Sequence, residues 1–532
     1  MISYLSLTLS LLAYKYDWYH NGKIVIPSKV ETSDDDIFKA GSTELLARTW
    51  KELEKSSLSC LLFGGEMHVA KGDDVQSDAK ENGVKKHYHF HRDESLFELY
   101  DAISSERLKK KSFQNYMEIL STSEVIAKIA ADIDDLGMLE KHEFLDENEV
   151  LTCSNINNVF CTNILEDKTE YNQLTLSEWI RSYSILCHIA EEVNAGNIPS
   201  ILDVSLILDK LIRAGVKKEK AEIFIELASF GKSSKDLYDC PLIKMHSGHY
   251  LLAYYGLVSA DVSNLILSRF SSLEVEVSSK GYKFEDSVNE IVSKHLSKSK
   301  SFKFKRGGEE YEYDSVFILD DKIFILECKN RSLSWSNPVK IFRSKKYLSK
   351  TAQQVMRLKN ALLEHPEVVH EHFDVNVKEY EIIPIILNCM PFSWKGKFEG
   401  VYISDLSSLS RFSKSSKINM VIVNREGQSV RQVSKLDQWT GVRPNAHDLI
   451  KHFEDPIQLA PYIRSRRRNQ TWWISNDEVA FTVTNFDIDA EKYAKEEKSL
   501  FSTFPSKTKV KNNKSKNRKK IQKKSKKRNR KN

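Results

Sequence analysis

The chain has 532 residues, 41% of them hydrophobic and 29% charged, a composition typical of a globular protein with about two to four domains. The net charge of +6 is uneven: residues 506–532 contain 15 Lys or Arg and no Asp or Glu, and removing 15 positive charges from +6 leaves −9 on the rest. Seven cysteines without a CxxC pair favour a reducing cytoplasm over a zinc knuckle, and no run approaches the ~18 apolar residues of a membrane span.

The first 200 residues predict a mostly helical α+β region of unknown function. Residues 1–28 are expected to form strands around a turn at Asn21-Gly22, and a helix is expected from Ser42. Thr175-Leu176-Ser177-Glu178 is a capping box that starts another helix, whose aromatic stripe predicts core packing. The histidines in residues 87–91 (HYHFH) would share one face of a strand. That face predicts either a metal site with His68 or Glu66, or a histidine-rich edge strand; the second is favoured because no further ligand completes a set.

Residues 201–275 predict more helices and a β-hairpin around Ser247-Gly248, expected to pack against the following domain. Residues 276–412 contain the most informative pattern. Residues 311–319 (YEYDSVFIL) and 322–329 (KIFILECK) predict two strands joined at Asp320-Asp321, with a helix around Phe284 before them and a helix capped by Thr351 after them.

Charged residues gather at one end of this predicted hairpin. Alternation along a strand places Glu327 and Lys329 on one face, and Asp314 of the partner strand can reach the same end. Carboxylates buried on a sheet face must be paired or bound to metal. Two such oxygen ligands suit Mg²⁺, and the backbone carbonyl of Cys328 could supply another. A lysine beside them could orient a water and stabilise charge on a phosphate, as metal-assisted phosphodiester hydrolysis requires.

In the order helix, strand, strand, helix, these residues resemble the PD-(D/E)XK nuclease superfamily, which has the restriction-endonuclease-like fold. The resemblance implies a central mixed sheet flanked by helices, Asp314 and Glu327 as metal ligands, and Lys329 as the catalytic lysine. Glu285, on the first core helix, is expected to complete the metal shell, and Gln353, on the helix after the hairpin, is expected to be a catalytic residue because it lies where some members carry a glutamine. Tyr313 stands where many members have proline. Glu290 and Glu312 are rival carboxylates, and Glu312 shares the strand parity of Asp314.

Two basic clusters predict contacts with nucleic acid, although either could be solvated surface. The first is a loop over residues 330–350 and the second precedes a pair of tryptophans in a separate C-terminal α+β region, 413–503. The candidates are Arg331, Trp335, Lys345, Lys346, Arg466, Arg467, Arg468 and Trp472. Residues 504–532 are expected to be a disordered tail that attracts nucleic acid non-specifically.

The sequence thus predicts a cytoplasmic, multi-domain α/β protein with no membrane segment. The expected activity is cleavage of DNA with Mg²⁺, or Mn²⁺ in its place, in anti-phage defence or restriction. The alternatives are an RNA or tRNA nuclease, a repair or recombination nuclease, and a binding module without catalysis. A partner encoded nearby or a homo-oligomer is also expected, by analogy with defence nucleases.

Overall fold

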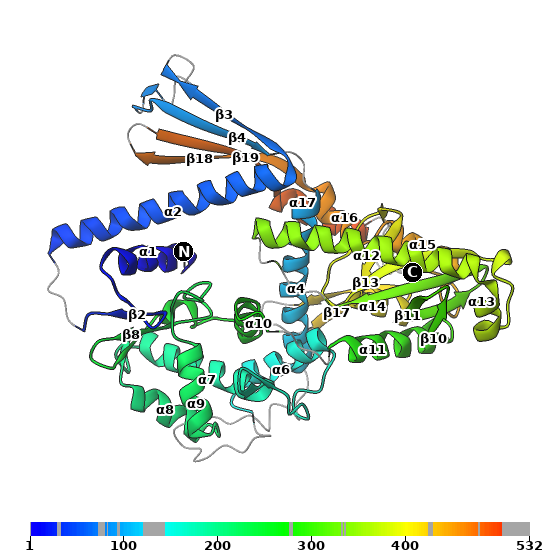
Figure 1. Ribbon diagram of the computed structural model, residues 1–532, viewed down its shortest axis with the longest axis horizontal. Helices are drawn as coiled ribbons and strands as arrows, with labels where there is room; N and C mark the ends of the chain where they lie inside the picture. The colour runs from blue at the N-terminus through cyan, green and yellow to red at the C-terminus, as the bar shows by residue number, and fades with distance from the viewer. Residues whose placement is uncertain are drawn as a thin grey trace, which may run out of the picture.

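The protein is described here from a computed structural model, shown in Figure 1. The structure describes residues 2–28, 33–72, 80–81, 83–92, 96–120, 144–275, 280–330, 334, 337–423, 429–476 and 479–502. Within these ranges it is a mixed α/β protein that contains several sheets. None of the described helices combines the length and apolar character needed to cross a bilayer. The basic tail lies outside the described residues.

A six-stranded mixed sheet forms the centre of the fold, in the order β10-β11-β12-β13-β15-β14. The first three strands are antiparallel, and β12, β13 and β15 run parallel. The predicted hairpin is present, and Asp320 adopts the left-handed conformation of its turn (φ 53°). The strands are β10 (Ser299–Arg306), β11 (Glu309–Leu319), β12 (Lys322–Lys329), β13 (Glu381–Asn388), β14 (Lys397–Phe398) and β15 (Val401–Asp405).

Helices cover both faces of this sheet because its central strands are apolar on both sides. On one face pack α11 (Lys280–His295), α14 (Leu406–Lys414) and α15 (Ala446–Glu454). On the other pack α12 (Pro338–Glu364) and α13 (Pro366–Phe373), followed by the short helix η3 (Val377–Glu379). Phe284 and Val288 anchor α11 to the sheet, as their helical spacing predicted.

The helix after the hairpin begins earlier than predicted. Asn337 caps α12 and Pro338 occupies its first turn, where a missing N–H costs nothing. Thr351 is therefore not a cap but a buried residue inside α12, and its hydroxyl donates to the Tyr347 carbonyl. The basic residues after 337 lie on this helix, so the prediction of a loop over residues 330–350 was wrong for that part.

The N-terminal region has its own core, which continues across residue 200. Trp179, Tyr183 and Phe224 lie inside it, so the aromatic stripe after Thr175 is core packing as predicted. Its helices are α6 (Glu147–Phe160), α7 (Leu176–Asn194), α8 (Val204–Arg213), α9 (Lys218–Leu227) and α10 (Val262–Ser272), with the small strands β5 (Glu170–Tyr171) and β6 (Leu174–Thr175) and the short helix η2 (Tyr254–Gly256).

The start of the chain is helical rather than extended: α1 spans Ile2–Lys15. The turn at Asn21-Gly22 is present, with both residues at positive φ. The hairpin around Gly248 joins this N-terminal part and not the central sheet, because β8 pairs with β2. The strands are β1 (Tyr19–His20), β2 (Lys23–Ile26), β7 (Ile201–Leu202), β8 (Leu242–Met245) and β9 (Tyr250–Leu252), in the order β1-β2-β8-β9-β7.

A third sheet unites both ends of the described chain, in the order β18-β19-β4-β3. Figure 1 shows it beyond the long helix α2, away from the central sheet. Its strands are β3 (Gly65–Lys71), β4 (Lys86–Arg92), β18 (Arg466–Asn476) and β19 (Val479–Ile488). Because β19 pairs in parallel with β4, residues 413–503 do not form a separate unit.

The remaining elements link these parts. α2 (Asp34–Phe63) starts at a Ser33 capping box, nine residues before the Ser42 start that was predicted. The other elements are α16 (Ala460–Arg464), α17 (Ala490–Ser502) and the hairpin of β16 (Lys417–Val423) with β17 (Ser429–Asp437). α4 (Leu96–Leu120) connects two cores, since Phe97 packs on the central sheet and Leu108 packs on the N-terminal helices.

Candidate active site

Asp314 lies at a β-bulge in the central sheet. Lys300 of β10 pairs with Val316 of β11, but Phe302 pairs with Tyr313, so two residues of β11 face one residue of β10. A bulge bends its strand and changes the direction of its side chains, and bulges often lie beside active sites. The expected alternation along β11 is therefore interrupted at the position that carries the predicted acid.

Side chains from two neighbouring elements hold this bulge. Bulging leaves the Asp314 carbonyl without a regular strand partner. The Ser301 hydroxyl donates to that oxygen at 2.6 Å, and Asn289 Nδ2 of α11 donates to it at 3.0 Å. Asn289 also donates to Ser301 Oγ at 2.9 Å. The helix that carries Glu285 thus fixes the backbone of the strand that carries Asp314.

The Asp314 carboxylate reaches the end of β12. Its Oδ2 accepts a hydrogen bond from the Cys328 backbone N–H at 2.7 Å. The Cys328 side chain points to the opposite face, into the core under α11, where burial raises the pKa of its thiol well above the usual value. Cys328 therefore contributes backbone groups here, and its sulfur is a core side chain.

Glu327 is buried, with 2% of its surface exposed, and it faces α12. Its Oε1 accepts from Lys329 Nζ at 2.6 Å and from Gln354 Nε2 at 2.8 Å. Its Oε2 is buried and, within the described ranges, has no hydrogen-bond partner. Because an unsatisfied charged oxygen in the interior is costly, Oε2 is an open acceptor for a cation or a water.

The acidic groups at this end of the hairpin interact strongly. Burial, and then the charge of Glu327, raises the pKa of Asp314 to about 7. Burial also raises the pKa of Glu285, together with the charges of Glu312 and Glu327. Burial opposes the charge of Lys329, but the adjacent Glu327 carboxylate outweighs burial and raises the pKa of the lysine. One lysine thus serves several acids that a further positive charge would stabilise.

The glutamine that reaches this site is Gln354 and not Gln353. Both are exposed positions on α12, but neighbouring residues on a helix point about 100° apart. Only the second of the two is directed at Glu327. The sequence signal for it was present in the pair of adjacent glutamines, but the phase of the helix could not be fixed without its true start at Pro338.

The predicted nucleic-acid contacts that the structure describes lie on two different elements. Lys345 and Lys346 lie on α12, where Lys346 Nζ is 4.7 Å from the centroid of the Phe342 ring. Arg466, Arg467 and Arg468 lie on β18 in the third sheet, and Arg467 forms ion pairs with Asp487 and Asp489. Arg331 and Trp335 lie outside the described residues, as does the side chain of Trp472.

Asp314 and Glu327 are the side chains at this site that could hold a metal ion. Within the described ranges, no group of three or more His, Cys, Asp or Glu side chains is placed to hold one. The geometry therefore does not make Glu285 a third ligand beside Asp314 and Glu327. Mg²⁺, however, keeps several waters and often uses only one or two carboxylates. Asp314, with its raised pKa, and Glu327, with its open Oε2, fit that smaller set.

The histidine-rich strand β4 has a different role from either predicted one. It lies inside its sheet and not at an edge. The rings of His87 and His89 hydrogen-bond to Thr482 and Thr484 of β19, at 3.0 and 3.1 Å. These imidazoles therefore connect β4, from the N-terminal part of the chain, to β19, from its C-terminal part.

Comparison with known proteins adds no identification. No protein-family profile, no curated protein and no solved structure matches this chain.

Proposed function

We propose that this protein is a Mg²⁺-dependent nuclease that hydrolyses phosphodiester bonds, with DNA as the favoured substrate. The observation that carries the proposal is the charge imbalance at the end of β11 and β12. Glu327 is buried and Asp314 is half-buried beside Lys329, and Glu327 Oε2 has no hydrogen-bond partner among the described residues. Such a site favours a divalent cation, and Lys329 lies beside it with its ammonium charged.

The arrangement of the surrounding elements supports the same proposal. A helix bearing Glu285 precedes an antiparallel hairpin whose strands bear Asp314 and the Glu327-Cys328-Lys329 triplet, and α12 follows. That order resembles the core of the PD-(D/E)XK superfamily, and the parallel strands β13 and β15 extend the sheet in a compatible way. Fold likeness alone does not assign an activity, so the weight rests on the side chains.

Each residue has a distinct task in the proposed reaction. When bound, the metal ion supplies a Lewis acid for the phosphoryl oxygen and lowers the pKa of a coordinated water. Asp314 and Glu327 hold it through carboxylate oxygens. Lys329 donates toward the attacking water and the growing negative charge on the phosphate. Gln354 fixes the Glu327 carboxylate through Oε1, which leaves Oε2 free for the cation.

DNA is favoured over RNA by analogy with the superfamily, and the basic tail suits either polymer. The test is a cleavage assay with supercoiled plasmid, linear duplex DNA and tRNA, each with Mg²⁺ or with EDTA. We expect Mg²⁺-dependent cleavage of DNA that Asp314→Ala abolishes, while Lys378→Ala, on exposed η3, cleaves like wild type. If tRNA is cleaved and neither DNA is, the substrate is RNA and not DNA.

Metal binding needs a measurement that does not depend on turnover. Mn²⁺ titration followed by electron paramagnetic resonance should detect a site that Glu327→Gln weakens about tenfold or more. If wild type binds DNA but neither binds Mn²⁺ nor cuts any of the three substrates, the protein is a binding module and the nuclease proposal fails.

A further inference from the structure

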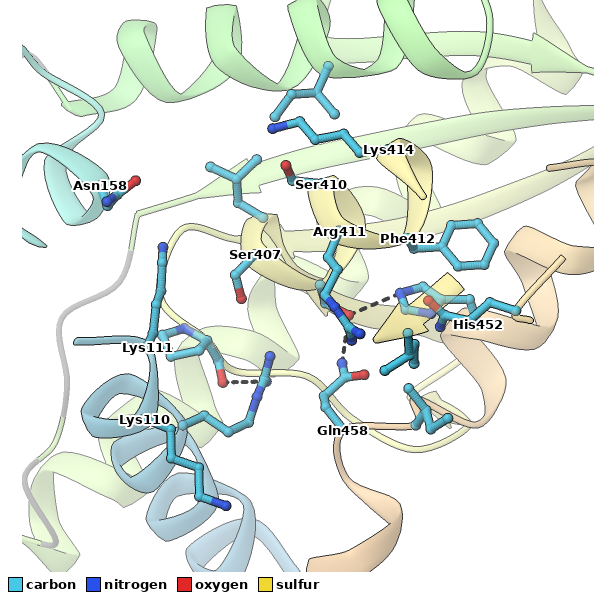
Figure 2. A pocket seen from close by; sticks show the side chains of 18 of the residues that line it. Lys110, Lys111, Asn158, Ser407, Ser410, Arg411, Phe412, Lys414, His452 and Gln458 are labelled. Atoms are coloured by element: carbon cyan, nitrogen blue, oxygen red, sulfur yellow. Dashed lines mark hydrogen bonds between the residues drawn. The ribbon is translucent and has the colours of Figure 1, made fainter. Parts of the chain in front are cut away.

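A second polar site lies where the N-terminal helices meet the helices of the central sheet. It is a cavity of ≈ 860 Å³ whose walls come from α4, α6, α11, α14 and residues after 438 (Figure 2). Cavities that bind small molecules typically have volumes of about 300–1,000 Å³. This one is therefore large enough for a ligand the size of a nucleotide.

The cavity wall is strongly cationic. Two of its cations are already paired: Arg107 with the buried Asp405 and Lys110 with Glu497. Three others also line it, Lys111 from α4 and Arg411 and Lys414 from α14. In the part of the chain that the structure describes, none of these three side chains forms an ion pair or hydrogen bond. Figure 2 shows Lys110 and Lys111 on one side of the cavity and α14 with Arg411 on the other.

Arg411 is the most informative of the three. Its side chain is exposed, but the neighbouring protein partly desolvates it and so lowers its pKa; a guanidinium nevertheless remains charged in proteins. A partly desolvated cation without a counter-charge is unfavourable, and an anion that enters the cavity relieves that cost. The planar guanidinium can also donate two parallel hydrogen bonds to a phosphate.

Neutral groups complete the wall around these cations. The Ser410 hydroxyl lines the cavity, and the Asn158 amide, which donates one hydrogen bond to the Ser154 carbonyl, has a second N–H to donate. His452 is uncharged at neutral pH, since burial lowers its pKa to about 4, and its ring stacks on Phe412 at 4.3 Å between centroids. Both rings are buried, so the cavity presents exposed cations beside neutral polar groups, an arrangement suited to an anionic ligand.

We propose that this cavity binds a nucleotide-sized ligand that bears two or more phosphate groups, held by Lys111, Arg411 and Lys414. A nucleic-acid duplex fits less well. A compact space of this volume is about 10 Å across, narrower than the major groove alone of B-DNA. The proposal does not depend on the nuclease activity, because none of these three cations contacts Asp314 or Glu327.

The direct test is isothermal titration of the full chain with inorganic pyrophosphate and with ATP, with adenosine as a ligand that lacks phosphate. We expect both phosphate ligands to bind below about 1 mM and adenosine to bind at least tenfold more weakly. Arg411→Ala and Lys414→Ala should each weaken binding about tenfold or more. Arg411→Lys, which keeps the charge, should retain part of the affinity.

Matched controls separate this effect from general charge and from misfolding. Lys378→Ala removes an exposed lysine that does not line the cavity and should bind like wild type. Each variant's thermal unfolding midpoint should stay near that of wild type. The proposal is overturned if neither pyrophosphate nor ATP binds at 1 mM, or if Arg411→Ala and Lys378→Ala bind them equally. It is also overturned if Arg411→Ala weakens only the binding of duplex DNA.

Discussion

The site at Asp314 and the cavity beside α14 have opposite charge. At the first, the buried Glu327 and the half-buried Asp314 lie beside Lys329, and Glu327 Oε2 lacks a hydrogen-bond partner among the described residues. At the second, three cations lack partners among the described residues, and the acids nearby are already paired. Unpaired charge of one sign in a partly buried place is stabilised by a ligand of the other sign. The two sites therefore predict a cation and an anion respectively.

The two sites also differ in how the chain builds them. The residues around Asp314 come from one continuous stretch, from Glu285 to Gln354. The cavity takes residues from Arg107 to Glu497, so helices far apart in sequence must meet before it exists. The first site is a property of one sheet and its two covering helices. The second depends on how the N-terminal helices dock on that sheet.

The largest expected effect comes from removing Lys329 from the acidic site. Lys329→Ala should lower the cleavage rate about 100- to 1,000-fold, as the loss of a single charge-stabilising donor does in other enzymes. Lys329→Arg should also be impaired, because the larger, planar guanidinium of arginine does not replace the compact lysine ammonium beside a water. Single-turnover cleavage with Mg²⁺ measures both variants. Near-wild-type rates in the arginine variant would exclude Lys329 as the group that assists the water.

The next effect concerns Arg107, which lines the cavity. Arg107 of α4 donates to both carboxylate oxygens of Asp405, at 2.8 and 3.2 Å, and Asp405 is fully buried. Arg107→Ala leaves that carboxylate uncompensated and should cost about 3–5 kcal/mol of unfolding free energy. Denaturant unfolding measures the loss. The double variant Arg107→Met with Asp405→Asn should lose less than Arg107→Ala alone, whereas an equal or greater loss would mean that the pair itself is not the cause.

Sequence analysis found the acidic site because its signals are local. The hairpin follows from two apolar runs and a turn at Asp320, and strand alternation placed Glu327 and Lys329 together. The bulge at Asp314 was not predicted, since it depends on how Ser301 and Asn289 pair with the strand in three dimensions. Gln354 was missed for a similar reason, because the start of α12 sets which glutamine faces the sheet.

The rest of the fold depended on contacts that no local pattern contains. α1 has apolar residues that alternate in part, so it resembled a strand until its packing was known. The pairing of β19 with β4 joins residues almost 400 positions apart. His87 and Thr482, for example, are separated by 395 positions in the sequence. The cavity also depends on such distant contacts. In the sequence, each of its cations looks like part of an ordinary solvated helix face. The cations come together only because α4 and α14 line the same cavity.

The adjacent glutamines offer a matched test of the acidic site at single-residue resolution. Gln354→Ala removes the donor to Glu327 Oε1 and should lower the cleavage rate about tenfold. Gln353→Ala changes the neighbouring exposed residue and should leave the rate within about twofold. Both variants replace an exposed glutamine of α12 with alanine, so their thermal unfolding midpoints should be similar. Equal rates in both would mean that the bond to Glu327 has no part in the chemistry.

The tail should change affinity without touching either site. Removing residues 506–532 takes away 15 positive charges. Binding to duplex DNA should weaken, and the slope of log affinity against log salt should become shallower, because fewer counterions are released. Metal-dependent cleavage at saturating DNA and pyrophosphate binding should both persist. Unchanged affinity at low salt would exclude the tail from DNA binding.

The smallest expected effect is a pH dependence of stability that belongs to the acidic site alone. Because the folded protein raises the pKa of Asp314 from 3.8 to about 7, the folded state holds this proton more tightly than the unfolded state. The contribution of Asp314 to stability is therefore present below about pH 4 and is lost as the pH rises to about 7. Asp314→Asn cannot ionise and should not show that loss, so in EDTA at pH 8 it should unfold about 1–3 °C above wild type.

The same comparison at pH 5 supplies the control, since most wild-type molecules then keep the Asp314 proton in the folded state and the difference should shrink. Adding Mg²⁺ at pH 8 should raise the unfolding midpoint of wild type more than that of Asp314→Asn, because only the ionised carboxylate attracts the cation. Parallel curves for the two proteins across this pH range, with no differential response to Mg²⁺, would mean that the carboxylates at the end of the hairpin do not interact as the charge argument requires.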